Sequence, residues 1–245
     1  MALNNGVNME WKEYSKELKE VLKIKGNPIA VTYSMNPVKD HRKGKCRACD
    51  ALVLARDGEV INLTKESSSC RGAAWHLGLE PRPSGKDLKD VQKFLVEGEK
   101  FCSSITVFHR METLCTPPPL GLAENVIISP LEKSEIRPDL VLFICNAEQA
   151  CRLLTLATYF DGVPPKLEVI GATCHTSIAY SIASGQINAN FIDYTSRKIK
   201  GFGKDELIIT IPYEKMDNLV KAIPLCSAGT AKVEYPEEFR RSASE

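Results

Sequence analysis

The sequence predicts an α/β protein, with α+β as the alternative, in which helices flank a mixed sheet. Short apolar runs that read as strands alternate with amphipathic segments of helical length along the whole chain. Hydrophobic residues make up 43% of the 245 residues, which is ample for a core. No polar linker is long enough to separate two domains, so we expect one domain over residues 1–235 and a polar tail over residues 236–245.

The first half of the chain is expected to open with an amphipathic helix. Apolar residues recur at helical spacing over residues 8–23, and Gly26-Asn27-Pro28 ends the pattern before a strand at residues 29–33. A basic loop that carries two cysteines follows. The next elements are expected as a helix, a short strand and two further helices, at residues 51–55, 60–63, 73–77 and 86–96.

The second half alternates more regularly. Strands are expected at residues 105–108, 125–128, 140–144, 167–170 and 207–211, and helices at residues 148–159, 174–183 and 214–222. Prolines make residues 116–121 a stiff loop. The strand–helix units that begin at Pro138 and Lys204 look alike, which fits either a weak internal duplication or the general pattern of α/β chains.

Charge and hydropathy limit the classes of partner. The formal net charge is +1, so no overall field recruits nucleic acid or a membrane surface. No apolar run approaches the ~20 residues that cross a bilayer, and the N-terminus lacks the pattern of a signal peptide. We therefore expect a soluble cytoplasmic protein, in which disulfides are a poor explanation for nine cysteines. Cys145 and Cys151 are expected to be core residues.

Three other cysteines have the spacing of metal ligands. Cys46 and Cys49 form a C-x-x-C in a basic loop, and Cys70 stands at the entrance to a predicted helix. A gap of two residues lets both thiolates face one ion or cluster, and thiolates select zinc or iron–sulfur centres. The helix dipole favours a thiolate at Cys70. Serines before it offer hydrogen bonds to sulfur, and four nearby cations offset negative charge: Lys43, Lys45, Arg47 and Arg71.

The fourth ligand is less evident. Cys174 stands at another strand-to-helix junction, the kind of place where α/β folds build sites, and it is the preferred candidate. The competing thiols and nearby nitrogen donors are Cys102, Cys115, Cys226, His41, His76 and His175. A structural zinc site usually offers two close ligand pairs, whereas this chain has one pair and then isolated cysteines, which favours a [4Fe–4S] cluster over zinc.

Several phrases in order along the chain resemble the uncharacterised DUF169 family: residues 26–31, 46–49, 70–79, 138–141, 171–174 and the segment that ends in Ile211-Pro212. The resemblance covers most of the chain. It implies a cytoplasmic prokaryotic protein, often from an anaerobe, with cysteines that look like cluster ligands. A further Gly-Cys is expected in many members within the segment that here spans residues 187–197. Its absence means that no role resting on that cysteine transfers to this chain.

Three functions follow as hypotheses. The first is an enzyme whose [4Fe–4S] cluster has an open coordination place for a small anionic or sulfur-containing substrate, with Arg47, Arg71 and His76 to orient it. The second is an electron-transfer or redox-sensing module with four cysteine ligands, Cys46, Cys49, Cys70 and Cys174, that docks to a redox partner protein. The third is a ligand-binding protein stabilised by zinc or free of metal. The sequence names neither the reaction nor the oligomeric state, and it leaves open whether the protein is an enzyme.

Overall fold

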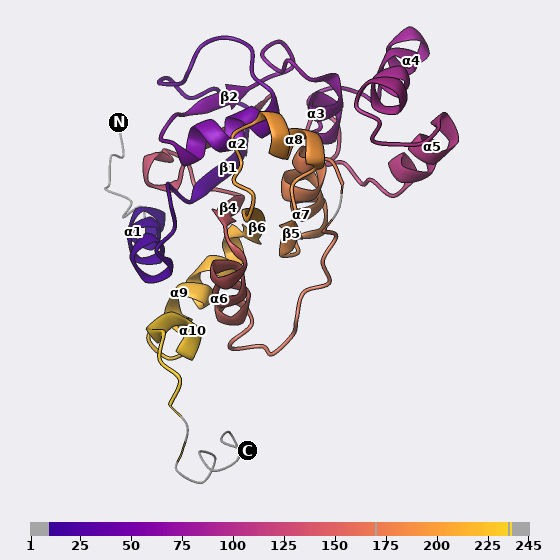
Figure 1. Ribbon diagram of the computed structural model, residues 1–245. Helices are drawn as coiled ribbons and strands as arrows, with labels where there is room; N and C mark the ends of the chain where they lie inside the picture. The colour runs from indigo at the N-terminus through magenta and orange to yellow at the C-terminus, as the bar shows by residue number, and fades with distance from the viewer. Residues whose placement is uncertain (1–9, 170, 235, 237–245) are drawn as a thin grey trace, which may run out of the picture.

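The computed structural model describes residues 10–169, 171–234 and 236, and within them six strands form one open sheet (Figure 1). Its order is β2-β3-β1-β4-β6-β5. The strands are β1 Ile29–Ser34, β2 Ile61–Leu63, β3 Asn125–Pro130, β4 Leu140–Cys145, β5 Asn188–Asn190 and β6 Leu207–Pro212. Strands and helices are thus combined as the α/β prediction requires. All five pairings among these strands are antiparallel, where a mixed sheet was expected. Strands buried on both faces give the same apolar runs in either direction, so the sequence does not reveal strand direction.

Helices cover both faces of this sheet. The α-helices are α1 Glu10–Leu22, α2 Ala48–Arg56, α3 Arg71–His76, α4 Gly85–Lys93, α5 Ile105–Thr113, α6 Ala147–Ala157, α7 Tyr180–Ser184, α8 Tyr194–Ile199, α9 Met216–Ala222 and α10 Ser227–Thr230. Four short helices of other types are η1 Phe94–Gly98, η2 Leu131–Lys133, η3 His175–Ala179 and η4 Tyr213–Lys215, of which η1 and η3 are π-helices.

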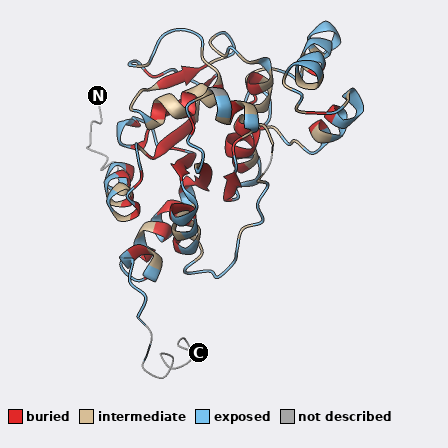
Figure 2. Cartoon of the chain, viewed as in Figure 1, coloured by how far each residue is buried: buried red, intermediate tan, exposed pale blue. Residues whose placement is uncertain are grey.

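Alternate residues of the central strand β4 feed two separate cores. Leu140, Leu142 and Ile144 pack with α2, α3 and η3 on one face. Val141 and Phe143 pack with α1, α6 and α9 on the other. Figure 2 shows the buried residues gathered on the strands and on the helix sides that meet them. The first face carries the functional site described below.

The sheet is built from two similar halves that meet where β1 pairs with β4. Ile29 pairs with Pro130 in the first half as Leu140 pairs with Pro212 in the second. Each of these prolines ends its strand and begins a 3₁₀ turn, η2 or η4. The amide of Leu131 donates to the carbonyl of Pro28, and the amide of Tyr213 donates in the same way to Asp139. The structural repeat therefore relates the segment β1–β3 to the segment β4–β6. It does not relate the two units, beginning at Pro138 and Lys204, that look alike in the sequence.

Helices α4, η1 and α5 leave the body of the molecule and stand apart from the sheet (Figure 1). The chain returns through the proline-rich loop, which packs on Gly78 at the end of α3. This glycine has φ +73°, and a Cβ there would lie 3.0 Å from the carbonyl oxygen of Pro119. A side chain at this φ would be strained and would press on the loop, so glycine is favoured here.

Two predicted strands are wrong. Residues 105–108 begin helix α5, because the Ser104 hydroxyl accepts a hydrogen bond from the amide of Val107 and caps the helix. Residues 167–169 lie in no strand, and Ile170 is outside the described residues. The Asn188 side chain bonds both the amide and the carbonyl of Glu168, and so replaces a strand ladder at the edge of β5.

Two further predictions concern the C-terminal tail and membrane-spanning helices. The predicted tail at residues 236–245 falls almost wholly outside the described residues, and the single-domain boundary at residue 235 stays a prediction. Among the described residues, every helix is too short or too polar to cross a membrane.

The prediction that Cys145 and Cys151 are both core residues is right only for Cys145. Comparing the two cysteines therefore tests the effect of burial on stability. Burial raises the pKa of the Cys145 thiol from 9.0 to about 12, whereas Cys151 is exposed on α6. Because the pKa of this thiol is higher in the folded than in the unfolded protein, the folded state is favoured fully below pH 9. That contribution to stability is lost as the pH rises toward 12. By pH 11 the wild type should lose about 2–3 kcal/mol of unfolding free energy that Cys145→Val retains.

Urea unfolding between pH 8 and pH 11 with a reductant present measures this difference. Cys151→Ser is the matched control and should follow the wild type at every pH. The same alkaline loss in Cys145→Val as in the wild type would contradict the assignment.

Candidate metal centre and its cavity

A cavity of about 740 Å³ lies between the body of the protein and the α4–α5 excursion. The body contributes the starts of α2, α3, η3 and α8, and the excursion contributes mostly apolar side chains. Because β1 pairs with β4, helix starts from both halves of the sheet meet at this cavity. A concave site of this volume is in the range that binds small molecules.

Three of the four predicted ligands line the same cavity. Cys49 lies in the first turn of α2, Cys70 precedes the first residue of α3, and Cys174 precedes the first residue of η3. Burial is the largest cause of the raised pKa of Cys174, and charge on Cys70 and then on Cys49 raises it further, as expected of thiols that line one cavity. Three cysteines from separate elements are thus brought together by the fold.

Cys46 occupies a different position from its C-x-x-C partner. Its backbone pairs with that of Ser68, two residues before Cys70, which ties the cysteine loop to the start of α3. Its thiol donates to the carbonyl of Arg47 at 3.3 Å, and it is not among the residues that line the cavity. Cys46 packs against the same core as Cys70 and Cys174, so it stands next to the site without facing it.

Burial favours the protonated thiols of Cys49 and Cys174. It is the largest cause of the raised pKa of Cys49, to about 11, with the charge of Asp50 adding to it and the hydroxyl of Ser196 opposing it. Burial likewise raises the pKa of Cys174 well above its ordinary value. A metal that binds here must displace protons, so its affinity rises with pH.

Two buried polar atoms near Cys174 have no hydrogen-bond partner among the described residues. They are the hydroxyl of Tyr33 and Nε2 of His175. Tyr33 is close enough that charge on Cys174 raises its pKa, after the larger effects of burial and of Asp139. His175 is only 3% exposed and lines the cavity. Unpaired buried groups are rare in proteins and call for an acceptor or donor that a bound group would supply.

The three predicted substrate-orienting residues all line the cavity. Arg71 is exposed and forms an ion pair with Asp87 of α4. His76 stacks on Trp75 and lies 5.2 Å from the ring centre of His175. Burial, and then His175, lowers the pKa of His76 to about 3, so it is neutral and brings no charge to a substrate. Arg47 is therefore the best placed of the three to meet an anion.

The competing ligands are separated by the fold. Cys115 lines the cavity from the far end of α5, whereas Cys102 is buried and does not line it. Cys226 packs in the core on the opposite face of the sheet. The ring of His41 lies by the carbonyl of Val38, also away from the cavity. Among the described residues, no three His, Cys, Asp or Glu side chains are close enough to share one metal ion.

Residues that sequence reasoning missed hold the Cys174 segment in place. Asp193 accepts hydrogen bonds from the amide and hydroxyl of Thr173, and from the amide and hydroxyl of Ser196. One carboxylate thus joins the start of η3 to the start of α8. The signal was present in the sequence, because Asp193 followed three residues later by Ser196 is a helix-capping pattern.

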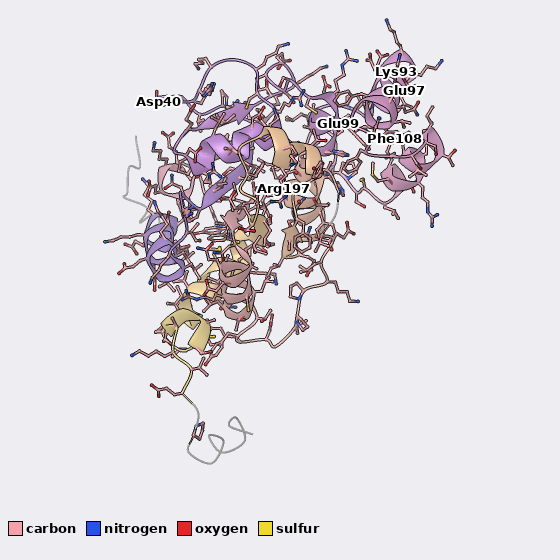
Figure 3. All side chains as sticks on the ribbon, in the orientation of Figure 1. Asp40, Lys93, Glu97, Glu99, Phe108 and Arg197 are labelled. Carbon is pink, nitrogen blue, oxygen red and sulfur yellow. The ribbon has the colours of Figure 1, made fainter. Side chains whose placement is uncertain are left out.

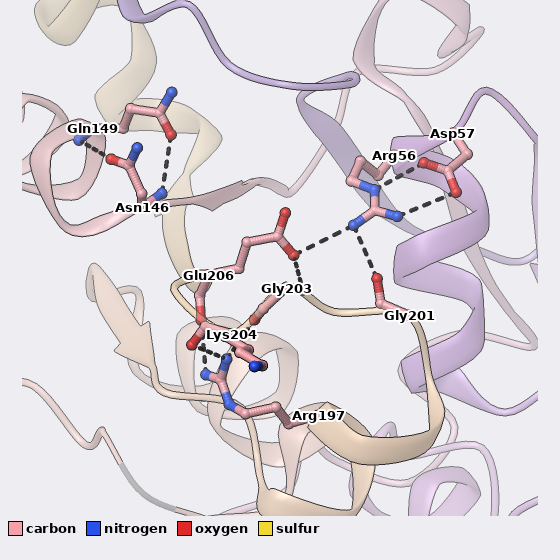
Figure 4. Close-up of polar contacts among 9 residues, drawn as sticks. All are labelled: Arg56, Asp57, Asn146, Gln149, Arg197, Gly201, Gly203, Lys204 and Glu206. Carbon is pink, nitrogen blue, oxygen red and sulfur yellow. Dashed lines mark hydrogen bonds and ion pairs between the residues drawn. The ribbon is translucent and has the colours of Figure 1, made fainter.

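The loop from α8 to β6 is fixed by arginines (Figure 4). Arg197 donates to the backbone carbonyls of Phe191, Gly203, Lys204 and Glu206. Arg56 of α2 reaches the same loop through Gly201 and the carboxylate of Glu206. Lys200, which lines the cavity, forms an ion pair with Asp50 at 2.8 Å. These bonds tie α8 to α2 beside the three cysteines.

These features define a class: an α/β protein with a cysteine-lined cavity at the junction of two sheet halves. The profile of DUF169, described as an uncharacterised ArCR family, matches residues 17–222, and the chain belongs to that family. It is 23% identical over 233 residues to Uncharacterized protein MJ0308 of Methanocaldococcus jannaschii, a match that covers 87% of this chain and 94% of the relative. No solved structure matches.

Removing the Asp193 carboxylate should loosen the Cys174 segment. Asp193→Ala removes a helix cap and two bonds to Thr173, so the free energy of unfolding should fall by about 2–3 kcal/mol in urea titrations. Asp161→Ala is the control, because Asp161 accepts only from the amide of Val163 in an exposed loop, and should cost less than about 0.5 kcal/mol. Equal losses in the two variants would refute the anchoring role.

Proposed function

We propose that this protein binds an iron–sulfur cluster at Cys49, Cys70 and Cys174 and holds a small molecule in the adjoining cavity. The observation that carries the proposal is the placement of the three thiols, from α2, α3 and η3, on the wall of one cavity. Thiolates are the ligands that iron–sulfur clusters use. The thiolates of such a cluster site bind separate irons, so they need not converge on a single ion.

The surroundings suit a group of negative charge. Each of the three cysteines lies at the beginning of a helix, where backbone amides and the helix dipole favour anions. Arg47 and Lys200 also line the cavity. Nε2 of His175 has no partner among the described residues and lines the cavity next to Cys174, where it would hydrogen-bond to a bound group. The Tyr33 hydroxyl is also without a partner among these residues but does not line the cavity.

When bound, an iron with an open coordination place supplies a Lewis acid that polarises an oxygen or sulfur of a substrate. The side chains of this protein would then bind and orient the substrate: Arg47 pairs with an anionic group, and Trp75 and His76 give a flat wall beside it. We also propose a cytoplasmic location, since a reducing compartment keeps nine cysteines free.

Anaerobic purification gives the direct test. The protein should be brown, with a broad absorption band near ~400 nm and matching iron and sulfide contents. Cys49→Ser, Cys70→Ser and Cys174→Ser should each lower the affinity for the cluster at least about tenfold, since loss of even outer partners costs that much. Cys115→Ser is the control, because Cys115 lines the same cavity from the segment that follows α5, and it should keep the cluster. A colourless protein that contains zinc, or one without metal, would overturn the proposal in favour of a structural role.

Cys46 distinguishes an enzyme from a redox module. Its thiol does not line the cavity, so Cys46→Ser should retain the iron content and absorption of the wild type, which leaves one iron open toward the cavity. Iron analysis and the visible spectrum of that variant measure this. Complete loss of the cluster would mean four cysteine ligands and a closed cluster, which is the arrangement of an electron-transfer or redox-sensing protein.

A further inference from the structure

We infer that the small molecule that occupies the cavity is amphipathic, with an aromatic or branched apolar body against the α4–α5 excursion and an anionic group at Arg47. This inference rests on the proposed cavity function and names the class of ligand. It concerns the wall of the cavity opposite the cysteines. A carboxylate or sulfonate on a hydrophobic body has the required chemistry.

The excursion has little core of its own. Phe94 is 50% exposed although it lines the cavity, and Leu95, Phe101 and Met111 are only partly buried there. Figure 3 shows Phe108 on this excursion, and its buried side chain also lines the cavity. Helices that leave the body and turn apolar side chains toward a cavity gain stability when an apolar group fills it.

The opposite wall is polar and has an unused cation. Arg47 lies just before the first residue of α2, a helix of nine residues, and forms no ion pair among the described residues. Nε2 of His175 is buried, unpaired and belongs to the same lining. A buried polar atom without a partner at the end of a cavity indicates a polar group on the ligand. One wall therefore favours an apolar body and the other favours an anionic group, so one ligand must carry both.

Three of the six carboxylates that line the cavity are engaged by protein groups, which limits their effect on an anionic ligand. Asp87 pairs with Arg71, and Glu112 pairs with Arg82. Asp193 is held by Thr173 and Ser196. Asp90 and Glu168 are exposed to solvent, and solvent screens exposed charges. The remaining one, Glu99, lies close enough for Arg47 to lower its pKa against the larger effect of burial. An anionic ligand must share Arg47 with Glu99.

The test uses two probes of similar shape and different charge. Anilinonaphthalene sulfonate carries an aromatic body and an anionic group, and N-phenylnaphthylamine carries the same kind of body without charge. Both are titrated calorimetrically into the full-length protein purified without oxygen. Trp75 lines the cavity and Trp11 lies in the core on the opposite face, so energy transfer from tryptophan in Trp11→Phe locates the probe. We expect both probes to bind, the sulfonate more tightly.

Two sets of variants test separately how the apolar body and the anionic group of the ligand are bound. Phe94→Ser and Met111→Ser should weaken both probes about tenfold, because each removes apolar surface from the wall. Val107→Ser, on α5 and 43% exposed but not in the lining, is the matched control and should change neither. Arg47→Ala should weaken only the sulfonate, about tenfold, and Lys43→Ala in the same loop should have no effect.

Three results would overturn the inference. They are equal weakening by Val107→Ser and Phe94→Ser, no binding of either probe, and equal effects of Arg47→Ala on the charged and neutral probes. Iron and sulfide contents are measured on every variant. Loss of probe binding with an intact cluster rejects the ligand class alone, and probe binding by protein without a cluster rejects the metal centre alone.

Discussion

The pairing of β1 with β4 is the contact on which the site depends. It joins three residue pairs, Ile29–Leu142, Ala30–Val141 and Val31–Leu140, at the centre of the sheet. All of these side chains are buried, and they alternate between the two cores. Because the two halves are similar and meet there, the helices that follow β1 and β2 lie on the same face as those that flank β5. The cavity and its three cysteines occupy that junction.

Deprotonating the thiols of this site would carry an electrostatic cost, which Ser196 and Lys200 oppose at Cys49. Burial makes the thiolate forms of Cys49 and Cys174 unfavourable, and each thiolate would repel the others. Two further buried polar atoms near Cys174 lack partners in the part of the chain that the structure describes. A sequence that served stability alone would place apolar residues at these positions, as it does on the opposite face of the sheet. Strain of this kind is expected where a site is shaped for a bound group.

The α4–α5 excursion gives the site its second wall at low cost to the fold. Neither sheet core includes its side chains, and Figure 2 shows most of its surface exposed. Its attachment rests on the proline-rich loop that packs on Gly78 and on the ion pair between Arg71 and Asp87. Loosely attached elements are the usual source of ligand-binding walls, because they can adjust without disturbing the core.

The sequence by itself determined the local features of this protein. Apolar runs and helical spacing indicated β1, β2, β3, β4, β6 and most helices. The C-x-x-C spacing and the cysteines at expected helix starts indicated Cys46, Cys49, Cys70 and Cys174 as a group, of which the last three line the cavity. Tertiary structure decided the direction of the strands, the non-strand state of residues 167–169 and the separation of Cys46 from the cavity. The reason is physical: local patterns record which side chains prefer burial or a helix start. Which of them face one another depends on strand pairings between residues more than a hundred positions apart, and no short segment encodes these pairings.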